Sequence, residues 1–321
     1  MISRRYNYTF SLIRPIFRLY NRLANRSRPV PDPGLAPDQP ALILANHVTS
    51  LDPFYLSTGI ARPVFYVASD HIFRLGLASR IISFLVAPIP IVKSRIDLRT
   101  IRTIRTIKSI IDQAGLVGLF PEGNRSFNGL TGRILPATGK LVRQLRSPLL
   151  LYKIHGGYLS SPRWGRHRRR GVIRCELAMM LTADELAAMS PDAINELIQS
   201  GIDVDAFADQ KSSPVRFKGR RLAEYLERAL FICPKCEGLS TLSSKENLFF
   251  CSCGLTVRYN HFGLFDPADD WSKTRQSDGL FFDNTGSWDL WQRQKLIEML
   301  DRPEIVDPDG ITPVFRDSEE V

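Results

Sequence analysis

The chain has 321 residues, of which 44% are hydrophobic, so it can bury one substantial core and still have length for a small additional module. Its 43 lysines and arginines against 33 aspartates and glutamates give a formal net charge of +10, which favours anionic partners such as lipid headgroups, phosphorylated substrates or nucleic acid. Four of the five cysteines lie between Cys233 and Cys253, a distribution that argues against the disulfide framework of a secreted protein and favours a reducing, cytoplasmic compartment.

The segment from Tyr6 to Leu23 is predicted to form an amphipathic helix. Its apolar positions at helical spacing are Phe10, Ile13, Phe17, Tyr20 and Leu23, with arginines between them. A basic helix that carries aromatic residues suits an anionic lipid interface, and we favour this location over an ordinary helix packed on the domain. Because the arginines interrupt the apolar run, we predict neither a signal peptide nor a transmembrane helix.

After a proline-rich linker at 29–40, short apolar runs typical of buried strands alternate with helical stretches. The apolar runs are Ala41–Ala45, Val64–Val67, Ala87–Val92, Gly115–Phe120, Leu149–Ile154 and Val172–Leu181. Helical spacing is found at Ile101–Ile111 and Thr138–Gln144, and capping patterns at Thr182 and Ser190 begin two further helices. This alternation predicts an α/β fold, a sheet flanked by helices.

His47 follows the first predicted strand, and Asp52 comes five residues later. In a turn that leads into a helix, this carboxylate can reach one ring nitrogen of the histidine and leave the other to remove a proton from a hydroxyl nucleophile. The nucleophile would be the alcohol of an acceptor substrate. Taken alone, such a pair is more often a solvated loop than an active site.

A second motif, Phe120-Pro-Glu-Gly-Asn-Arg-Ser126, follows another predicted strand. Gly123 allows close backbone approach, and Arg125 offers a planar fork for phosphate oxygens. An isolated Glu-Gly-x-Arg motif is weak evidence, whereas the two motifs in this order are specific.

Together these motifs make the chain resemble the glycerolipid acyltransferases of the lysophosphatidic acid acyltransferase type. Asn46, His47 and Asp52 fit the first block of that family, Asn-His-x-x-x-x-Asp. The second motif fits the third block, Phe-Pro-Glu-Gly-Thr-Arg-Ser, with Asn124 where threonine is usual. Pro90-Ile-Val-Lys-Ser-Arg95 matches the second block, with Lys93 in the place of an arginine. The resemblance spans roughly residues 40–181.

The resemblance implies a 1-acylglycerol-3-phosphate O-acyltransferase, an enzyme of phospholipid biosynthesis that uses acyl-CoA or acyl-carrier protein as donor. His47 would be the general base and Asp52 its orienting partner. The implied substrate-binding residues are Glu122, Gly123, Arg125, Lys93 and Arg95. No catalytic cofactor is expected, because a thioester donor is already activated. The departures at Lys93 and Asn124 leave another lysophospholipid or a lyso-glycolipid open as acceptor.

Four cysteines are spaced like the ligands of a structural zinc site. Cys233 and Cys236 are followed after fourteen residues by Cys251 and Cys253, with a predicted hairpin between the pairs. Because all four positions would be taken by thiolates, the zinc would stabilise a small zinc ribbon and take no part in catalysis. Free or redox-active thiols are the alternative. Helices are predicted on either side, at Gly219–Leu230 and Trp288–Leu300.

Arg163 to Arg170 contains five arginines, and we favour contact with an anionic membrane or the phosphates of the acyl donor over a plain solvated loop. Zinc ribbons and basic loops also occur in nucleic-acid-binding proteins, but that class leaves the two motifs unexplained and is disfavoured.

Four segments are therefore predicted along the chain. Residues 1–35 form an interfacial helix and linker, 36–215 an acyltransferase domain, 216–262 a helix and zinc ribbon, and 263–321 a helical tail. The protein is expected at the cytoplasmic face of a membrane, as a peripheral or monotopic protein that binds an acyl donor and a lysophospholipid.

Overall fold

The computed structural model describes residues 4–27, 32–69, 73, 80, 84, 86–91 and 98–300, which fall into two units, Met1–Arg220 and Arg221–Val321. The division into four segments made from the sequence stays a prediction. No helix in the described part of the chain combines the length and the apolar character that crossing a bilayer requires.

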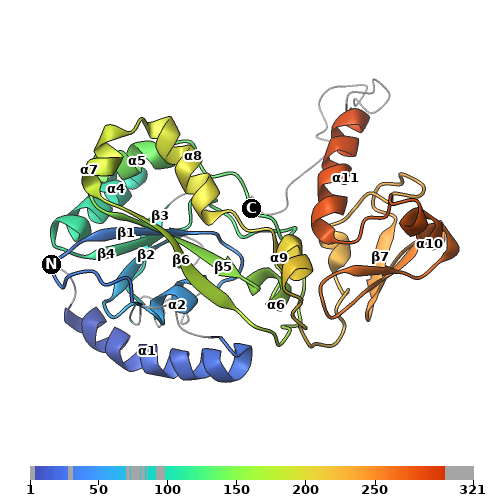
Figure 1. Cartoon of the computed structure of the whole chain (residues 1–321), viewed down its shortest axis with the longest axis horizontal. Coiled ribbons are helices and arrows are strands. Elements are labelled where there is room, and N and C mark those ends of the chain that lie inside the picture. Colours follow the sequence, from blue (N-terminus) through green and yellow to red (C-terminus); the bar gives the residue numbers. More distant parts are fainter. Residues whose placement is uncertain are drawn as a thin grey trace. The chain divides into compact units, whose positions relative to one another are not determined.

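A six-stranded sheet runs through the first unit in the order β3-β2-β4-β1-β5-β6 (Figure 1). The strands are β1 (Ala41–Ala45), β2 (Val64–Ser69), β3 (Ile89–Ile91), β4 (Leu116–Leu119), β5 (Leu149–His155) and β6 (Arg174–Leu181). Neighbouring strands pair in parallel, except β5 with β6, which are antiparallel. Every residue of the inner strand β1 is buried, because both faces of the sheet are covered there. The predicted α/β class and the predicted strands are confirmed, with Val92 outside the described residues.

Helices cover both sides of this sheet. They are α1 (Arg4–Asn25), α2 (Asp52–Ser57), α4 (Leu98–Asp112), α5 (Thr138–Leu145), α6 (Gly157–Ser160), α7 (Ala183–Ala188), α8 (Pro191–Ile202) and α9 (Ala206–Ser212). Figure 1 shows α4, α5, α7 and α8 on one side and α1 and α2 on the other. The predicted caps are present, since Thr182 forms a capping box with Glu185 and Ser190 accepts the Ala193 amide.

Helix α8 illustrates how this core is closed. Ile194, Ile198 and Ile202 recur every fourth residue, are completely buried, and join Leu149 and Leu151 of β5 in one apolar cluster. Complete burial of such a side chain contributes about 1.5–3 kcal/mol, so the helix is held by its inner face.

Helix α1 carries apolar residues on two faces. The inner face packs on the domain: the Tyr6 hydroxyl donates to the Val64 carbonyl at 2.8 Å, and the Phe17 ring stacks on Phe54 with 4.6 Å between centroids. An outer stripe is exposed, and it consists of Tyr8, Leu12, Ile16, Leu19 and Leu23.

The apolar face expected from the sequence is therefore only partly right. Phe10 is buried and Ile13 and Phe17 are half-buried against the domain, whereas Tyr20 and Leu23 are exposed. Helical spacing alone identifies apolar faces, but which face is covered depends on what the rest of the chain packs against it.

The second unit is built on a four-stranded antiparallel sheet in the order β10-β9-β8-β7. Its elements are β7 (Leu242–Lys245), β8 (Leu248–Cys251), β9 (Thr256–Tyr259), β10 (Phe265–Pro267), α10 (Asp270–Ser277) and α11 (Thr285–Leu300). The predicted hairpin between the cysteine pairs and the predicted C-terminal helix are confirmed. Trp288 of α11 is buried against Phe249 and Phe265, and its indole N–H donates to the Ile232 carbonyl at 3.0 Å.

The helix predicted at Gly219–Leu230 is wrong. The segment forms turns and a single 3-10 helix at Leu226–Arg228. Some of its backbone amides donate to the β7–β8 hairpin: Ala223 N donates to the Glu246 carbonyl at 3.0 Å and Tyr225 N to the Ser244 hydroxyl at 2.8 Å. Tertiary hydrogen bonds thus replace the helical ladder that the local sequence favours.

Candidate active site

The strand order brings the two sequence motifs to one edge of the sheet. Strand β1 pairs in parallel with β4 on one side and β5 on the other, so their carboxyl ends lie together, where ligands of open α/β sheets bind. The buried Asn46 side chain extends this pairing, because it donates to the Ile154 carbonyl at 3.0 Å and accepts the Ile154 amide at 2.7 Å. The loop that begins at His47 therefore leaves the sheet in a fixed direction.

His47 and Asp52 are in direct contact. The distance from His47 Nδ1 to Asp52 Oδ2 is 2.7 Å, with the aspartate completely buried and the histidine side chain 20% exposed. Because a carboxylate only accepts, this contact places the ring hydrogen on Nδ1 and leaves the Nε2 lone pair available. The sequence-predicted pair is thus assembled with the geometry of a general base.

The buried Asp52 carboxylate is itself held by the turn before α2. Its Oδ2 also accepts the backbone amides of Val48 at 2.7 Å and Thr49 at 2.9 Å, and its Oδ1 accepts the Thr49 hydroxyl at 2.7 Å. These hydrogen bonds offset the cost of burying the group and fix its orientation.

Glu122 ties the two motif loops together. One carboxylate oxygen accepts the His47 backbone amide and the other accepts the Gly132 amide, each at 2.6 Å. Burial raises the pKa of Glu122 to about 7, against the opposing effect of these two amides. The side chain predicted to touch substrate has both oxygens engaged by backbone, so in this structure it acts on the position of His47.

The His47 ring is also held from the side. It stacks on Phe120 with 4.3 Å between ring centroids and 19° between planes, and Phe120 is in turn stacked on Tyr66. Ser126 N donates to the His47 carbonyl at 2.8 Å. The sequence motif contains Phe120 and Ser126, but their role as supports for the histidine follows only from the pairing of β1 with β4.

The remaining predicted substrate residues lie partly in the described chain. Gly123 has a φ of +73°, a left-handed conformation that favours glycine, and it turns the loop that carries the half-buried Arg125. Lys93 and Arg95 lie outside the described residues. Arg125 makes no hydrogen bond or ion pair with any residue that the structure describes. Its guanidinium is therefore available for an anionic ligand.

The basic run at 163–170 is partly structural. Arg168 donates to Tyr20 of α1, to Asn25 Oδ1 at 2.7 Å and to the Tyr55 hydroxyl at 3.0 Å. Arg170 donates to the Leu23 carbonyl at 2.9 Å, and Arg169 is buried beside Trp164. The number of arginines in the sequence does not show which of them bind the protein itself and which can bind an external anion.

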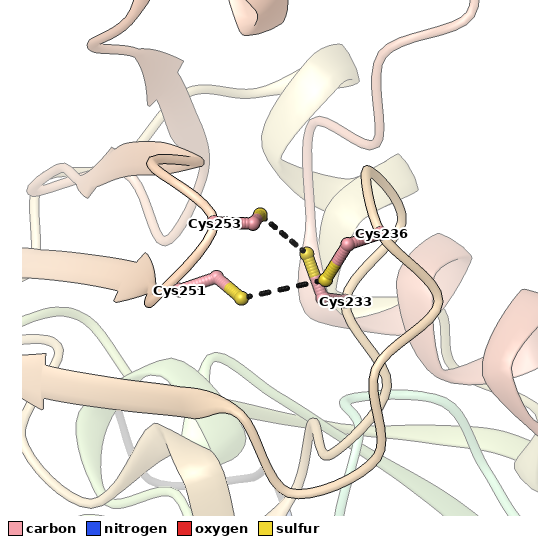
Figure 2. A group of neighbouring side chains, drawn as sticks. All are labelled: Cys233, Cys236, Cys251 and Cys253. Atoms are coloured by element: carbon pink, nitrogen blue, oxygen red, sulfur yellow. Dashed lines mark hydrogen bonds between the residues drawn. The ribbon is translucent and has the colours of Figure 1, made fainter.

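The four cysteines of the second unit converge (Figure 2). Their sulfur atoms lie within 4.8 Å of one another, with 3.7 Å from Cys233 to Cys253 and from Cys236 to Cys251. These separations are too long for disulfides, whose S–S bond is about 2.05 Å.

The cluster fits a tetrahedral metal ion. Four sulfurs at about 2.3 Å from a central zinc ion would be about 3.8 Å apart, close to the observed separations. Burial opposes ionisation of the Cys251 thiol, but its hydrogen bonds with the Cys253 amide and the Thr241 hydroxyl help to lower its pKa to about 6. The donor set is complete without a water molecule or a substrate, as in structural sites.

Comparison with known proteins agrees with this architecture. Residues 25–154 match the family model described as Acyltransferase, a range that contains both motif loops. Among solved structures, the chain resembles the crystal structure of PlsC, the 1-acyl-sn-glycerophosphate (LPA) acyltransferase of Thermotoga maritima, with a TM-score of 0.51 and 15% sequence identity. The likeness covers 68% of this chain and 86% of that one. No curated protein sequence matches significantly. The match to this family model confirms the resemblance to acyltransferases that was inferred from the motifs.

Proposed function

We propose that this protein, whose residues 25–154 match the Acyltransferase family model, acylates the free hydroxyl of 1-acyl-sn-glycerol-3-phosphate to give phosphatidic acid. The acyl donor is acyl-CoA or acyl-carrier protein. The observation that carries the proposal is the 2.7 Å contact between His47 Nδ1 and the buried Asp52. The neighbouring loop carries Arg125, which forms no ion pair with any residue that the structure describes.

His47 acts as general base in this scheme. Its Nε2 removes the proton of the acceptor hydroxyl as the oxygen attacks the thioester carbonyl, and Asp52 stabilises the imidazolium that forms. The tetrahedral intermediate then expels the thiolate, the C–S bond breaks, and the thiolate takes the proton from the imidazolium. General-base assistance of this kind contributes about 10²- to 10⁴-fold in rate.

Arg125 binds the acceptor phosphate, with Gly123 allowing close approach of the loop and Lys93 and Arg95 as further predicted contacts. A guanidinium offers two parallel N–H donors to phosphate oxygens, which gives orientation as well as charge. Glu122 supports the site through the His47 and Gly132 amides. The fold shared with the LPA acyltransferase PlsC supports this choice of acceptor.

The outer stripe of α1 rests in the lipid surface from which the acceptor is taken. Its five apolar side chains face away from the domain, and the exposed Arg18 and Arg22 lie on the same helix. Apolar residues beside cations favour the headgroup region of an anionic bilayer. This makes the protein peripheral or monotopic, at the cytoplasmic face.

The four cysteines bind one structural zinc ion. Bound metal would hold the two turns at Cys233–Cys236 and Cys251–Cys253 together and so stabilise the second unit. It takes no part in acyl transfer, because its coordination is closed by four thiolates.

The experiment that tests the function measures acyl transfer in anionic vesicles from acyl-CoA and from acyl-carrier protein, with wild type and His47→Ala. Acceptors are 1-acyl-glycerol-3-phosphate, other lysophospholipids and a lyso-glycolipid. We expect transfer to 1-acyl-glycerol-3-phosphate that falls at least about 10²-fold in the variant. Transfer only to another acceptor would reassign the substrate. The other acceptors are included because Asn124 and Lys93 depart from the family motifs. Undiminished activity of His47→Ala would refute the mechanism.

A further inference from the structure

The loop at 161–170 places a second arginine beside the loop that carries Arg125. The Arg163 guanidinium carbon lies 5.1 Å from the centre of the Phe127 ring, and Phe127 comes two residues after Arg125. This distance is that of a cation–π contact. Arg163, which follows Arg125 by 38 positions, is thereby held beside the loop that carries Arg125.

The position of Arg163 is fixed by its neighbour Trp164. The Trp164 side chain is buried, and its indole N–H donates to the Tyr158 hydroxyl at 3.0 Å. That hydroxyl donates to the Phe127 carbonyl at 3.4 Å. The tryptophan thus fastens the loop to the same segment over which the arginine lies.

Arg125 and Arg163 are close enough to repel one another. The pKa of Arg125 lies below the usual range of arginine, first because burial disfavours its charged form and second because of the positive charge of Arg163. Asp52 opposes this effect but forms no ion pair with Arg125. Two half-buried guanidinium groups that repel one another are stabilised by an anion that binds both.

We infer that Arg163 and Arg125 together bind the phosphate monoester of the acceptor lipid. The inference rests on the proposed function and adds to it a specificity-determining residue from outside the family motifs. A phosphate monoester carries close to two negative charges at neutral pH and has three terminal oxygens, enough to accept from both guanidinium forks.

The other end of the loop points to lipid as the source of this phosphate. Arg168 and Arg170 fasten it to the last turns of α1 at Tyr20, Asn25 and Leu23. The loop therefore joins the helix proposed to lie in the membrane surface to the motif loop that holds Arg125. A lipid phosphate lies at headgroup depth, whereas the phosphates of acyl-CoA arrive from solution.

Steady-state kinetics with Arg163→Gln and Arg163→Lys test the inference. We expect Arg163→Gln to raise the KM for 1-acyl-glycerol-3-phosphate by about 10- to 100-fold, as for the loss of a hydrogen bond to a charged group, with kcat and the KM for acyl-CoA within about 3-fold of wild type. Arg163→Lys keeps the charge but loses the paired N–H donors of the guanidinium, so its KM for the acceptor should lie between those of wild type and Arg163→Gln. Arg143→Gln, which removes the same charge from an exposed position on α5, is the matched control and should leave both KM values unchanged.

An unchanged KM for the acceptor in Arg163→Gln would overturn the inference, and so would a rise confined to acyl-CoA or an equal rise in Arg143→Gln. If the wild type transferred no acyl group to any acceptor, the proposed function would fail, and titration with glycerol 3-phosphate would decide the inference separately. Weaker binding by Arg163→Gln than by wild type would support a phosphate site, whereas equal binding would overturn it.

Discussion

Replacing Asp52 with asparagine removes one charge from the candidate site with little change of shape. The amide oxygen of Asp52→Asn can accept from His47 Nδ1 and from the Val48 and Thr49 amides, as Oδ2 does now. The new amide nitrogen can donate to the Thr49 hydroxyl, which now donates to Oδ1. We therefore expect the variant to fold, with a melting temperature close to that of wild type.

The expected loss of activity follows from the charge. When His47 takes the proton of the acceptor, the imidazolium lies against a carboxylate whose Oδ2 is 2.7 Å away and which is completely buried. Two unit charges about 4 Å apart attract by about 4 kcal/mol at an effective dielectric constant of about 20. Loss of that attraction in the transition state corresponds to a fall in kcat of about 10³-fold.

Single-turnover and steady-state assays of thiol release from acyl-CoA measure this loss. The matched control is Asp209→Asn, because Asp209 forms a second aspartate–histidine pair with His155, 2.6 Å from Nδ1 to Oδ2, in the same unit. We expect the control to retain activity within about 3-fold. A kcat for Asp52→Asn within about 3-fold of wild type, with the fold intact, would refute the reasoning about the imidazolium.

Three further expectations concern the supports of the site, the metal and the lipid surface. Burial raises the pKa of Glu122 from 4.5 to about 7, so the folded chain binds the carboxyl proton more tightly than the unfolded chain does. The contribution of Glu122 to the free energy of unfolding therefore falls as the pH rises from 4.5 to about 7, and it is constant above that pH. Denaturant unfolding should show this loss, up to about 3 kcal/mol, in wild type but not in Glu122→Gln; parallel pH profiles would contradict it. Chelator treatment or Cys236→Ser should release about one zinc ion per chain and lower the melting temperature of the second unit, and an unchanged melting curve would argue against a structural metal. Ile16→Glu, in the outer stripe of α1, should weaken sedimentation with anionic vesicles at least about 10-fold relative to Ser11→Glu, which adds the same charge outside the stripe, and equal weakening in both would point to charge alone.

Local patterns were sufficient for much of this protein. Strand β1 could be predicted because its residues are apolar without a break, as burial on both faces requires. Asp52 lies only five positions after His47, so one turn brings the two side chains together regardless of the rest of the fold. The cysteine turns and the helix caps are likewise built from residues close in sequence, where spacing alone limits the geometry.

Contacts between distant parts of the chain could not be predicted from local patterns, because they depend on how the strands pair. Glu122 reaches the His47 amide across 75 positions because β1 and β4 pair in parallel, and no local pattern specifies that pairing. Arg163 lies beside the motif loop because Trp164 is buried next to Tyr158. Local sequence is thus sufficient to identify which chemical groups are present and which short turns carry them. Strand pairing and burial decided which of these groups meet, because the free energy of those contacts comes from surfaces that only the folded chain brings together.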